Sequence, residues 1–179
     1  MPDTGWCSPT ATGDDYNDWN NPTNAYSSDD SYSNPPSTSD VQDWYDFNFG
    51  VPGGATIDGI EVRIEYHSYN SSGVQLDVEL SWNGGTNYTT SGKNVTTTST
   101  SDVTHTVGGV ADTWGRAWSD TEFSDANFRV RLDPASSSTR PDVDHIEVRV
   151  TYTEATTTTA TTTTATTTTV TTTTTAAPT

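Results

Sequence analysis

Residues 57–66 read IDGIEVRIEY, and residues 143–152 repeat the same pattern as VDHIEVRVTY. In both copies apolar residues occupy every second position, while Glu, Arg and Thr stand between them. Side chains alternate across a β-strand, so each copy predicts a strand with one aliphatic face in a core and one polar face in water. Glu and Arg on adjacent strands can form ion pairs. We therefore interpret the two copies as central strands of one antiparallel β-sandwich.

The composition divides the 179 residues into three parts. Residues 1–40 are rich in Pro, Gly, Asn, Asp and Ser but carry several aromatic rings, which predicts an irregular arm that docks on the sandwich. Residues 41–154 hold the predicted strands. Residues 155–179 are almost only Thr with a period of five, which predicts an extended, mucin-like tail. Because Thr is also a good strand former, pairing of tails from several subunits is an alternative.

Further alternation predicts strands at residues 41–49, 74–82 and 128–132. The four residues Asn70–Gly73 read as a hairpin turn, so strand 57–69 is predicted to pair directly with strand 74–82. Residues 108–127 read as a long crossover loop with one helical turn near Asp112–Arg116. Seven or eight short strands without a convincing helix predict an all-β, antiparallel sandwich of jelly-roll or related topology.

The charge of the chain restricts its partners. The formal net charge is −17, and residues 1–50 contain nine Asp but no Lys, Arg or Glu. A polyanion needs a cationic surface, so neither nucleic acid nor an anionic membrane is an expected partner. Since the sequence has neither an apolar region after Met1 nor an apolar run of about 18 residues, we expect no secretory signal and no membrane insertion.

Acidic residues of the arm are candidate ligands for calcium, because carboxylates in loops rich in Asn and Ser are hard oxygen ligands. These candidates are Asp14, Asp15, Asp18, Asp29 and Asp30. Their spacing does not match an EF-hand, and no other cofactor is predicted. The three histidines, His67, His105 and His145, are not brought together by any pattern in the sequence. The single cysteine, Cys7, cannot form an internal disulfide.

The sequence predicts no catalytic residue. Nucleophile-elbow, phosphate-loop, zinc-protease and Cys-x-x-Cys motifs are missing from it. A carboxylate pair for glycoside hydrolysis could be drawn from Glu61, Glu65, Glu79 and Glu147. Arginines stand among these acids at the same solvent-facing positions, so a ladder of ion pairs is the better interpretation.

Aromatic and Thr residues suggest three surface roles. Stacking on sugars, as in carbohydrate-binding modules, could use Trp19, Trp44, Trp82, Trp114 and Trp118, although core packing explains these rings equally well. Self-association through the arm would use Trp6, Tyr16, Trp19 and Tyr26. O-glycosylation of the tail would modify residues such as Thr156, Thr161, Thr166 and Thr171.

Several stretches together resemble a β-sandwich module found in uncharacterised structural proteins of tailed phages and in bacterial surface proteins. The stretches that carry the resemblance are residues 5–9 (GWCSP), 19–32 (WNNPTNAYSSDDSY), 47–62 (FNFGVPGGATIDGIEV), 128–132 (FRVRL) and 143–148 (VDHIEV). The resemblance implies a non-enzymatic virion or surface component and brings no catalytic residues. The Thr-rich tail is not part of that pattern.

The sequence thus predicts a structural protein of a virion or an extracellular assembly, most simply a phage capsid decoration or fibre subunit that associates through its arm or its tail. Its expected partners are copies of itself and other virion or surface proteins. Two alternatives stay open: a subunit of a glycosylated extracellular filament, and a carbohydrate-binding or adhesive module with a mucin-like linker. The second alternative makes glycans the partner.

Overall fold

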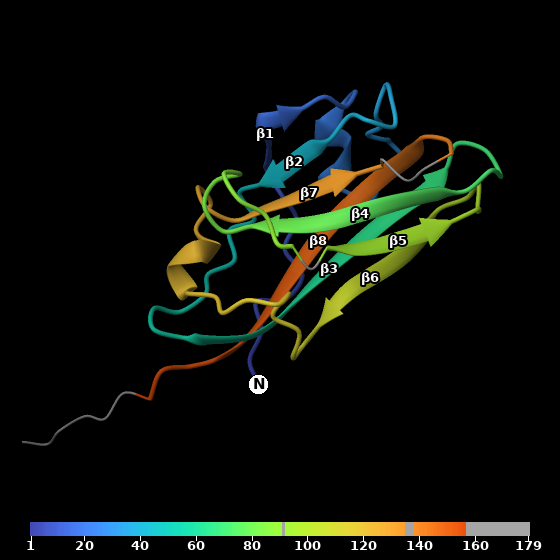
Figure 1. Ribbon diagram of the computed structural model, residues 1–179. Helices are drawn as coiled ribbons and strands as arrows, with labels where there is room; N and C mark the ends of the chain where they lie inside the picture. Colours follow the sequence, from blue (N-terminus) through green and yellow to red (C-terminus); the bar gives the residue numbers. More distant parts are fainter. Residues whose placement is uncertain (91, 135–137, 157–179) are drawn as a thin grey trace, which may run out of the picture.

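Figure 1 shows the computed structural model of the chain, in which two antiparallel β-sheets share one hydrophobic core. It describes residues 1–90, 92–134 and 138–156, without the side chains of residues 14–17. One sheet has the strand order β1-β2-β7-β4-β5, and the other has the order β6-β3-β8. The strands are β1 (Ala11–Asn17), β2 (Gln42–Tyr45), β3 (Thr56–Ser68), β4 (Val74–Ser81), β5 (Lys93–Thr97), β6 (Val103–Gly109), β7 (Arg129–Asp133) and β8 (Pro141–Thr153). The predicted all-β antiparallel sandwich is confirmed.

The two copies of the repeated stretch form β3 and β8, which pair with each other in antiparallel fashion. Val62 lies opposite Val148, and each is the equivalent of the other in its own copy. Because the ladder is symmetric about this position, the acid of one copy meets the base of the other. Two ion pairs follow, Arg63 with Glu147 and Arg149 with Glu61. The predicted acid–base pairing between these strands is confirmed.

The inward rows of both sheets fill the core. On β3 the alternate residues Ile60, Val62, Ile64 and Tyr66 are fully buried. Aromatic rings close one end of this core, where they pack edge to face and stacked against one another; they are Phe47, Phe49, Trp118, Phe123 and Phe128. The modest aliphatic content of the sequence is therefore supplemented by aromatic packing.

The predicted pairing of strand 57–69 with strand 74–82 is wrong. β3 and β4 belong to different sheets, so the turn at Asn70–Gly73 carries the chain from one sheet to the other. β4 pairs instead with β5 and β7, and Arg131 on β7 binds Glu79 on β4 with its Nε 2.8 Å from Oε2. Alternation shows which face of a strand is buried but not which neighbour its edges meet, so both arrangements satisfy the same pattern.

The arm contains a strand that its polar composition concealed. β1 pairs with β2 at the edge of the five-stranded sheet, so the prediction of an irregular arm is only partly right. β1 reads ATGDDYN, a run without apolar alternation, and its Gly13 has a φ of 98°. Other parts of the arm enter the core, where Trp19 is 4% exposed and Ala25 fully buried.

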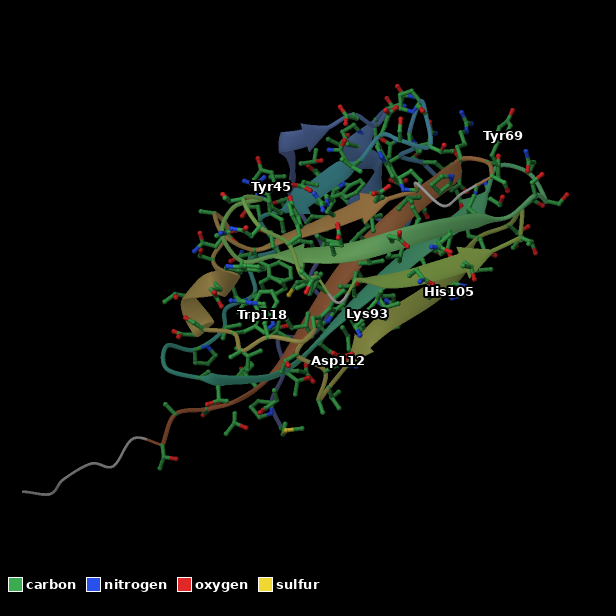
Figure 2. All side chains as sticks on the ribbon, in the orientation of Figure 1. Tyr45, Tyr69, Lys93, His105, Asp112 and Trp118 are labelled. Atoms are coloured by element: carbon green, nitrogen blue, oxygen red, sulfur yellow. The ribbon has the colours of Figure 1, made fainter. Side chains whose placement is uncertain are left out.

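The predicted helical turn near Asp112–Arg116 is also wrong. Trp114 and Gly115 both have positive φ angles, 54° and 76°, which a helix does not allow. Asp112 holds this bend by accepting the N–H of Trp114 at 2.9 Å and pairing with Lys93 at 2.7 Å. Figure 2 labels Lys93 and Asp112, which come from different segments of the chain. A short 3₁₀-helix forms later, at Asp120–Phe123, behind a capping box. Nowhere in the described ranges is there a helix with the length and apolar character needed to cross a membrane.

The two copies differ at one position for a steric reason. Gly59 in the first copy corresponds to His145 in the second, and a Cβ at Gly59 would collide with the backbone of Gly109, the last residue of β6, and of Val110 after it. We expect Gly59→Ala to lower the free energy of unfolding by about 1–3 kcal/mol, because backbone has to move to admit the methyl group. Urea unfolding followed by tryptophan fluorescence measures the change.

Gly53→Ala is the matched control for this substitution. Gly53 is exposed, has no positive φ, and its nearest neighbour would be 4.0 Å from the added methyl group. Its effect should stay within about 0.5 kcal/mol. Equal effects of the two substitutions would contradict the steric explanation.

Candidate functional site

A β-bulge in β8 aims Asp144 at the arm. Glu65 lies opposite His145 and Tyr66 lies opposite Val143, so Asp144 is the extra residue without a partner on β3. A bulge breaks the alternation of side chains and redirects the residue at its centre. Asp144 is consequently a carboxylate with only 1% of its surface exposed.

Two further carboxylates meet Asp144. Asp30 comes from a turn of the arm, where its φ is 62°, and Asp102 comes from the turn just before β6. One carboxylate oxygen from each of the three residues lies within 4.8 Å of the other two. Three segments that are distant in the sequence thus place three acids around one point, which we call the acidic cluster.

The surroundings of the acidic cluster hold its members in place. Asp144 accepts the backbone N–H of Asp29 at 3.2 Å. Asp102 is held at both oxygens, by the hydroxyl of Tyr32 at 3.0 Å and by Nδ1 of His67 at 2.9 Å. Burial, together with the hydrogen bond to Asp102, raises the pKa of Tyr32, so its hydroxyl stays protonated and donates.

Burial also raises the pKa of Asp144. Backbone N–H groups of Asp29 and Asp30 oppose this shift, and the charges of Glu65 and Asp102 reinforce it. A buried carboxylate beside other carboxylates resists ionisation unless a cation compensates. The cluster therefore has the electrostatics of a cation site, because a bound positive charge would make the ionised form of its carboxylates more favourable.

The chemistry of the cluster fits calcium. Ca²⁺ takes six to eight oxygen ligands, so three carboxylates supply part of its shell and leave positions for water or for hydroxyls of a ligand. Of the predicted calcium ligands only Asp30 belongs to the cluster, while Asp29 contributes a backbone N–H to it. Asp18 is exposed and outside the cluster, and the side chains of Asp14 and Asp15 lie outside the described residues.

Sequence reasoning missed Asp102 and Asp144. Asp144 has its equivalent in Asp58 of the first copy, and each is the extra residue of a bulge. The aspartate repeated in both copies was thus a possible signal of a special position. Only the pairing register shows that it is a bulge residue, outside the alternation of inward and outward side chains. Asp102 stands alone in a Ser-rich turn and gave no signal.

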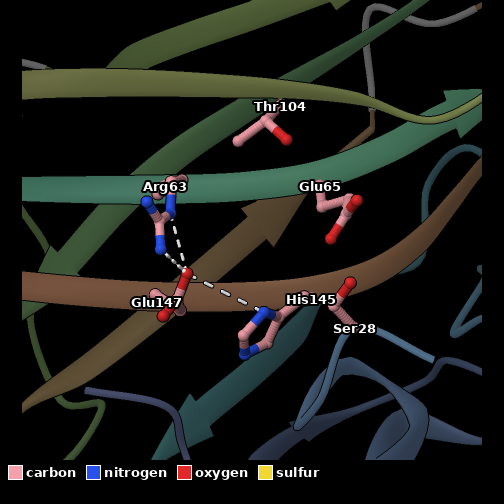
Figure 3. A pocket seen from close by; sticks show the side chains of 6 residues that line it. All are labelled: Ser28, Arg63, Glu65, Thr104, His145 and Glu147. Atoms are coloured by element: carbon pink, nitrogen blue, oxygen red, sulfur yellow. Dashed lines mark hydrogen bonds and ion pairs between the residues drawn. The ribbon is translucent and has the colours of Figure 1, made fainter. Parts of the chain in front are cut away.

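A polar groove of about 350 Å³ lies on the three-stranded sheet where the arm meets it (Figure 3). Three of its walls, Ser28, Thr104 and His145, lie one or two residues away from a cluster acid in the sequence, and the others come from β3 and β8. Its lining residues are Ser28, Arg63, Glu65, Thr104, His145 and Glu147. Arg63 donates from Nε to Glu147 Oε2 at 2.7 Å, and that oxygen lies 3.8 Å from Nδ1 of His145. The groove therefore presents hydroxyls, carboxylates, an imidazole and a guanidinium in a fixed arrangement.

Ser8, His145 and Glu147 are arranged side by side like the serine, histidine and acid of a hydrolase triad, but their contacts do not allow triad chemistry. Ser8 Oγ is 2.8 Å from Nε2 of His145. Glu147, however, is committed to Arg63 through the oxygen nearest the imidazole, and 3.8 Å is too long for a hydrogen bond. Ser8 is also not a wall of the groove. Its contact orients the ring of His145 rather than activating a nucleophile.

Three of the four candidate catalytic carboxylates are engaged in ion pairs; the fourth, Glu65, lines the groove and forms no ion pair among the described residues. Glu61 pairs with Arg149, Glu79 with Arg131 and Glu147 with Arg63, as the ladder interpretation predicted. Such acids have their charges compensated, so they are poorly suited to act as general acids. The absence of an enzymatic activity stays a prediction.

The tryptophan platform proposed from the sequence does not form. Trp19, Trp44, Trp114 and Trp118 are all less than 9% exposed and pack in the core. Trp82 is half-buried, with the guanidinium of Arg116 stacked 4.1 Å from its ring centre. The alternating pattern cannot distinguish rings of the core from rings of the surface, and in this structure most of these rings pack in the core.

The predicted self-association and glycosylation residues have mixed positions. Trp19 packs in the core of its own chain, Tyr26 is half-buried, and the side chain of Tyr16 lies outside the described residues. Trp6 is half-buried on the outer face of the three-stranded sheet. Thr156 is exposed, whereas Thr161, Thr166 and Thr171 lie outside the described residues. Association and glycosylation remain predictions.

Comparisons with known proteins give only distant similarities. Neither a protein-family model nor a curated protein sequence matches the chain. The CBM36-1 domain of a multidomain xylanase from the hindgut metagenome of Trinervitermes trinervoides is 10% identical, with a TM-score of 0.44 over 86% of this chain and 100% of that one. CBM35 from Paenibacillus barcinonensis is 15% identical, with a TM-score of 0.39 over 85% and 94%.

A third similarity is to the MgGH51 α-L-arabinofuranosidase, which is 13% identical, with a TM-score of 0.37 over 66% of this chain and 22% of that one. At these values the three similarities carry no argument about function. None of the three is described as a phage protein, so the virion role stays a prediction.

The raised pKa of Asp144 predicts the pH dependence of the cation-free protein. A protonated Asp144 contributes stability that is fully present below the ordinary pKa of 3.8 and is lost as the pH rises through the raised pKa. Asp144→Asn, which keeps the shape but does not titrate, should therefore have a higher Tm than the wild type at pH 7 in a chelator. The difference should shrink as the pH falls toward 3.8.

Excess Ca²⁺ should reverse this order, because only the wild type gains stability from binding. Asp77→Asn removes the same charge from β4 on the other sheet and should show neither effect. A Tm of Asp144→Asn at or below that of the wild type at pH 7 in chelator would contradict the electrostatic argument.

Proposed function

We propose that this chain is a non-catalytic binding module that holds Ca²⁺ in the acidic cluster and binds a hydroxyl-rich ligand, a glycan, in the polar groove. The observation that carries the proposal is the convergence of Asp30, Asp102 and Asp144 to within 4.8 Å, next in sequence to residues that line a polar groove. Three separate segments have to fold together to bring these acids into contact.

Electrostatics favour a cation at this point. Two unit charges 4 Å apart repel by about 1 kcal/mol in water and by about 4 kcal/mol at the effective dielectric constant of a protein surface. On the β3–β8 ladder Glu61 and Glu147 are paired with Arg, but across the described residues no Arg or Lys pairs with the acidic cluster, whose one ionic partner is His67, 2.9 Å from Asp102. A divalent cation would remove the repulsion of all three pairs at once.

The groove favours a neutral polyol. Adjacent hydroxyls of a sugar both donate and accept hydrogen bonds, and the groove offers carboxylate acceptors, a guanidinium donor and two hydroxyls that do both. Positions left open in the shell of the cation would accept two further sugar hydroxyls. The strongly negative net charge of −17 argues against nucleic acid as the ligand.

Calorimetry with CaCl₂ tests the cation half of the proposal. The wild type should bind one Ca²⁺, with a Kd of about 1 mM or tighter, as modules outside cells do. Asp102→Asn should weaken binding by about tenfold or more because it removes one ligand charge, and Asp77→Asn should match the wild type. No heat of binding up to 10 mM CaCl₂, a range set to about ten times that Kd, would refute the cation site.

A glycan array probed with and without a chelator tests the ligand half. Binding to sugars that disappears in chelator and in Asp102→Asn supports the complete proposal. Ca²⁺ binding without any sugar binding would leave the cation site standing and refute the groove as a glycan site.

Assembly with copies of itself, at a virion or cell surface, is a second candidate function. One observation favours it: residues 2–7 pair with the outer edge of β8 through backbone hydrogen bonds, in a manner that a second copy could reproduce.

A further inference from the structure

A short segment of the arm acts as a separate edge strand on the three-stranded sheet. Residues 2–7 run along β8, and the contacts are made by backbone groups. Cys7 and Val148 exchange two hydrogen bonds of 2.9 Å, and the N–H of Thr4 donates to the carbonyl of Val150 at 3.0 Å. The segment thereby satisfies backbone groups that would otherwise form an open sheet edge.

Two side chains attach this segment to the groove. The ring of Trp6 lies 4.3 Å from the guanidinium of Arg63 and 4.7 Å from that of Arg149. Ser8 holds the imidazole of His145. Arg63 and His145 are both walls of the groove, so residues 2–8 support the groove from outside.

The rest of the arm is attached in a different way. Trp19 and Ala25 are part of the core, and the indole N–H of Trp19 donates to the carbonyl of Asp40 at 2.9 Å. Those residues cannot leave without opening the core. Residues 2–7 insert no fully buried side chain: Cys7 packs against the core while only partly buried, and positions 2, 3 and 5 are exposed. The unit that can detach is therefore residues 2–8.

We propose that residues 2–8, whose residues 2–7 form the strand, are an exchangeable segment through which copies of this chain associate. In the associated form the segment of one copy pairs with β8 of the other, and its Trp6 lies between the partner's Arg63 and the partner's Arg149. Every contact is kept, because the same groups meet within one chain or between two. Reciprocal exchange closes a two-fold dimer, whereas one-way exchange extends into a filament. The inference does not depend on the cation site.

Concentration decides between the two forms. A tethered segment experiences an effective concentration of about millimolar, so the free chain closes on itself when dilute. Exchange becomes comparable when the local concentration of chains reaches about that value, as it does on a crowded assembly.

Disulfide trapping with Val148→Cys reads out the connectivity. Residues that exchange both backbone hydrogen bonds in an antiparallel pair have Cα atoms about 5.5 Å apart, which suits a disulfide. Because Cys7 is the only cysteine of the chain, the introduced thiol has one partner. Oxidised glutathione added to dilute protein should close the bond within one chain. Protein incubated at about 1 mM before oxidation should yield covalent dimers whose linked peptides contain residue 7 of one copy and residue 148 of the other.

The control variant is Val62→Cys, the equivalent position in the first copy, which does not face the segment. It should give no bond to Cys7 at either concentration. Covalent links that stay within one chain at every concentration would overturn the proposal, and so would dimers that join Cys7 to Cys7.

Sedimentation of the unmodified chain and of Trp6→Ala provides a test that does not need Val148→Cys to fold. Exchange predicts dimers at about 1 mM that return slowly to monomers after dilution. Trp6→Ala removes the same two cation–π contacts from both forms, so the monomer–dimer ratio should stay unchanged while the return becomes about 5- to 30-fold faster. A ratio that collapses in Trp6→Ala would indicate an ordinary surface contact and overturn the exchange, and monomers throughout would overturn association.

Discussion

The antiparallel pairing of β3 with β8 about the Val62–Val148 position is the constraint on which the rest of the structure depends. Since the two strands are copies of one pattern, this register sets each acid of one against the base of the other and buries both aliphatic rows on one face. A shift of one strand by one residue would turn its aliphatic row toward water. The register is consequently fixed by hydrophobic burial and by charge at the same time.

The same register creates two bulges, and their surroundings make them different. Each copy carries an aspartate that has no partner on the facing strand, Asp58 in the first and Asp144 in the second. Asp58 accepts the hydroxyl of Thr153 at 2.8 Å, which satisfies it locally. Asp144 is covered by the arm and meets Asp30 and Asp102. The repeated bulge is therefore structural at one end of the ladder and carries a candidate site at the other.

Alternation in the sequence was sufficient to predict the sandwich, the two long strands and the ion pairs between them, because these depend on which face of a strand is buried. It could not predict that β3 and β4 lie in different sheets, since edges are joined by backbone groups that every residue shares. Nor could it predict the acidic cluster. Asp30, Asp102 and Asp144 are separated by more than 40 positions at each step, and only the fold brings them together.

The polar arm is ordered because it packs against the sandwich in three ways. Trp19 fills the core, β1 extends one sheet, and residues 2–7 cover the edge of the other. The same region supplies Asp30 to the cluster and Ser28 to the groove. A segment that covers an edge through backbone contacts and also supports the walls of a binding groove couples the two, because displacing it would uncover the edge and release Arg63 and His145 together. Because exchange keeps every contact, ligand binding in the groove is expected to slow the release of residues 2–8 and to leave the monomer–dimer ratio unchanged.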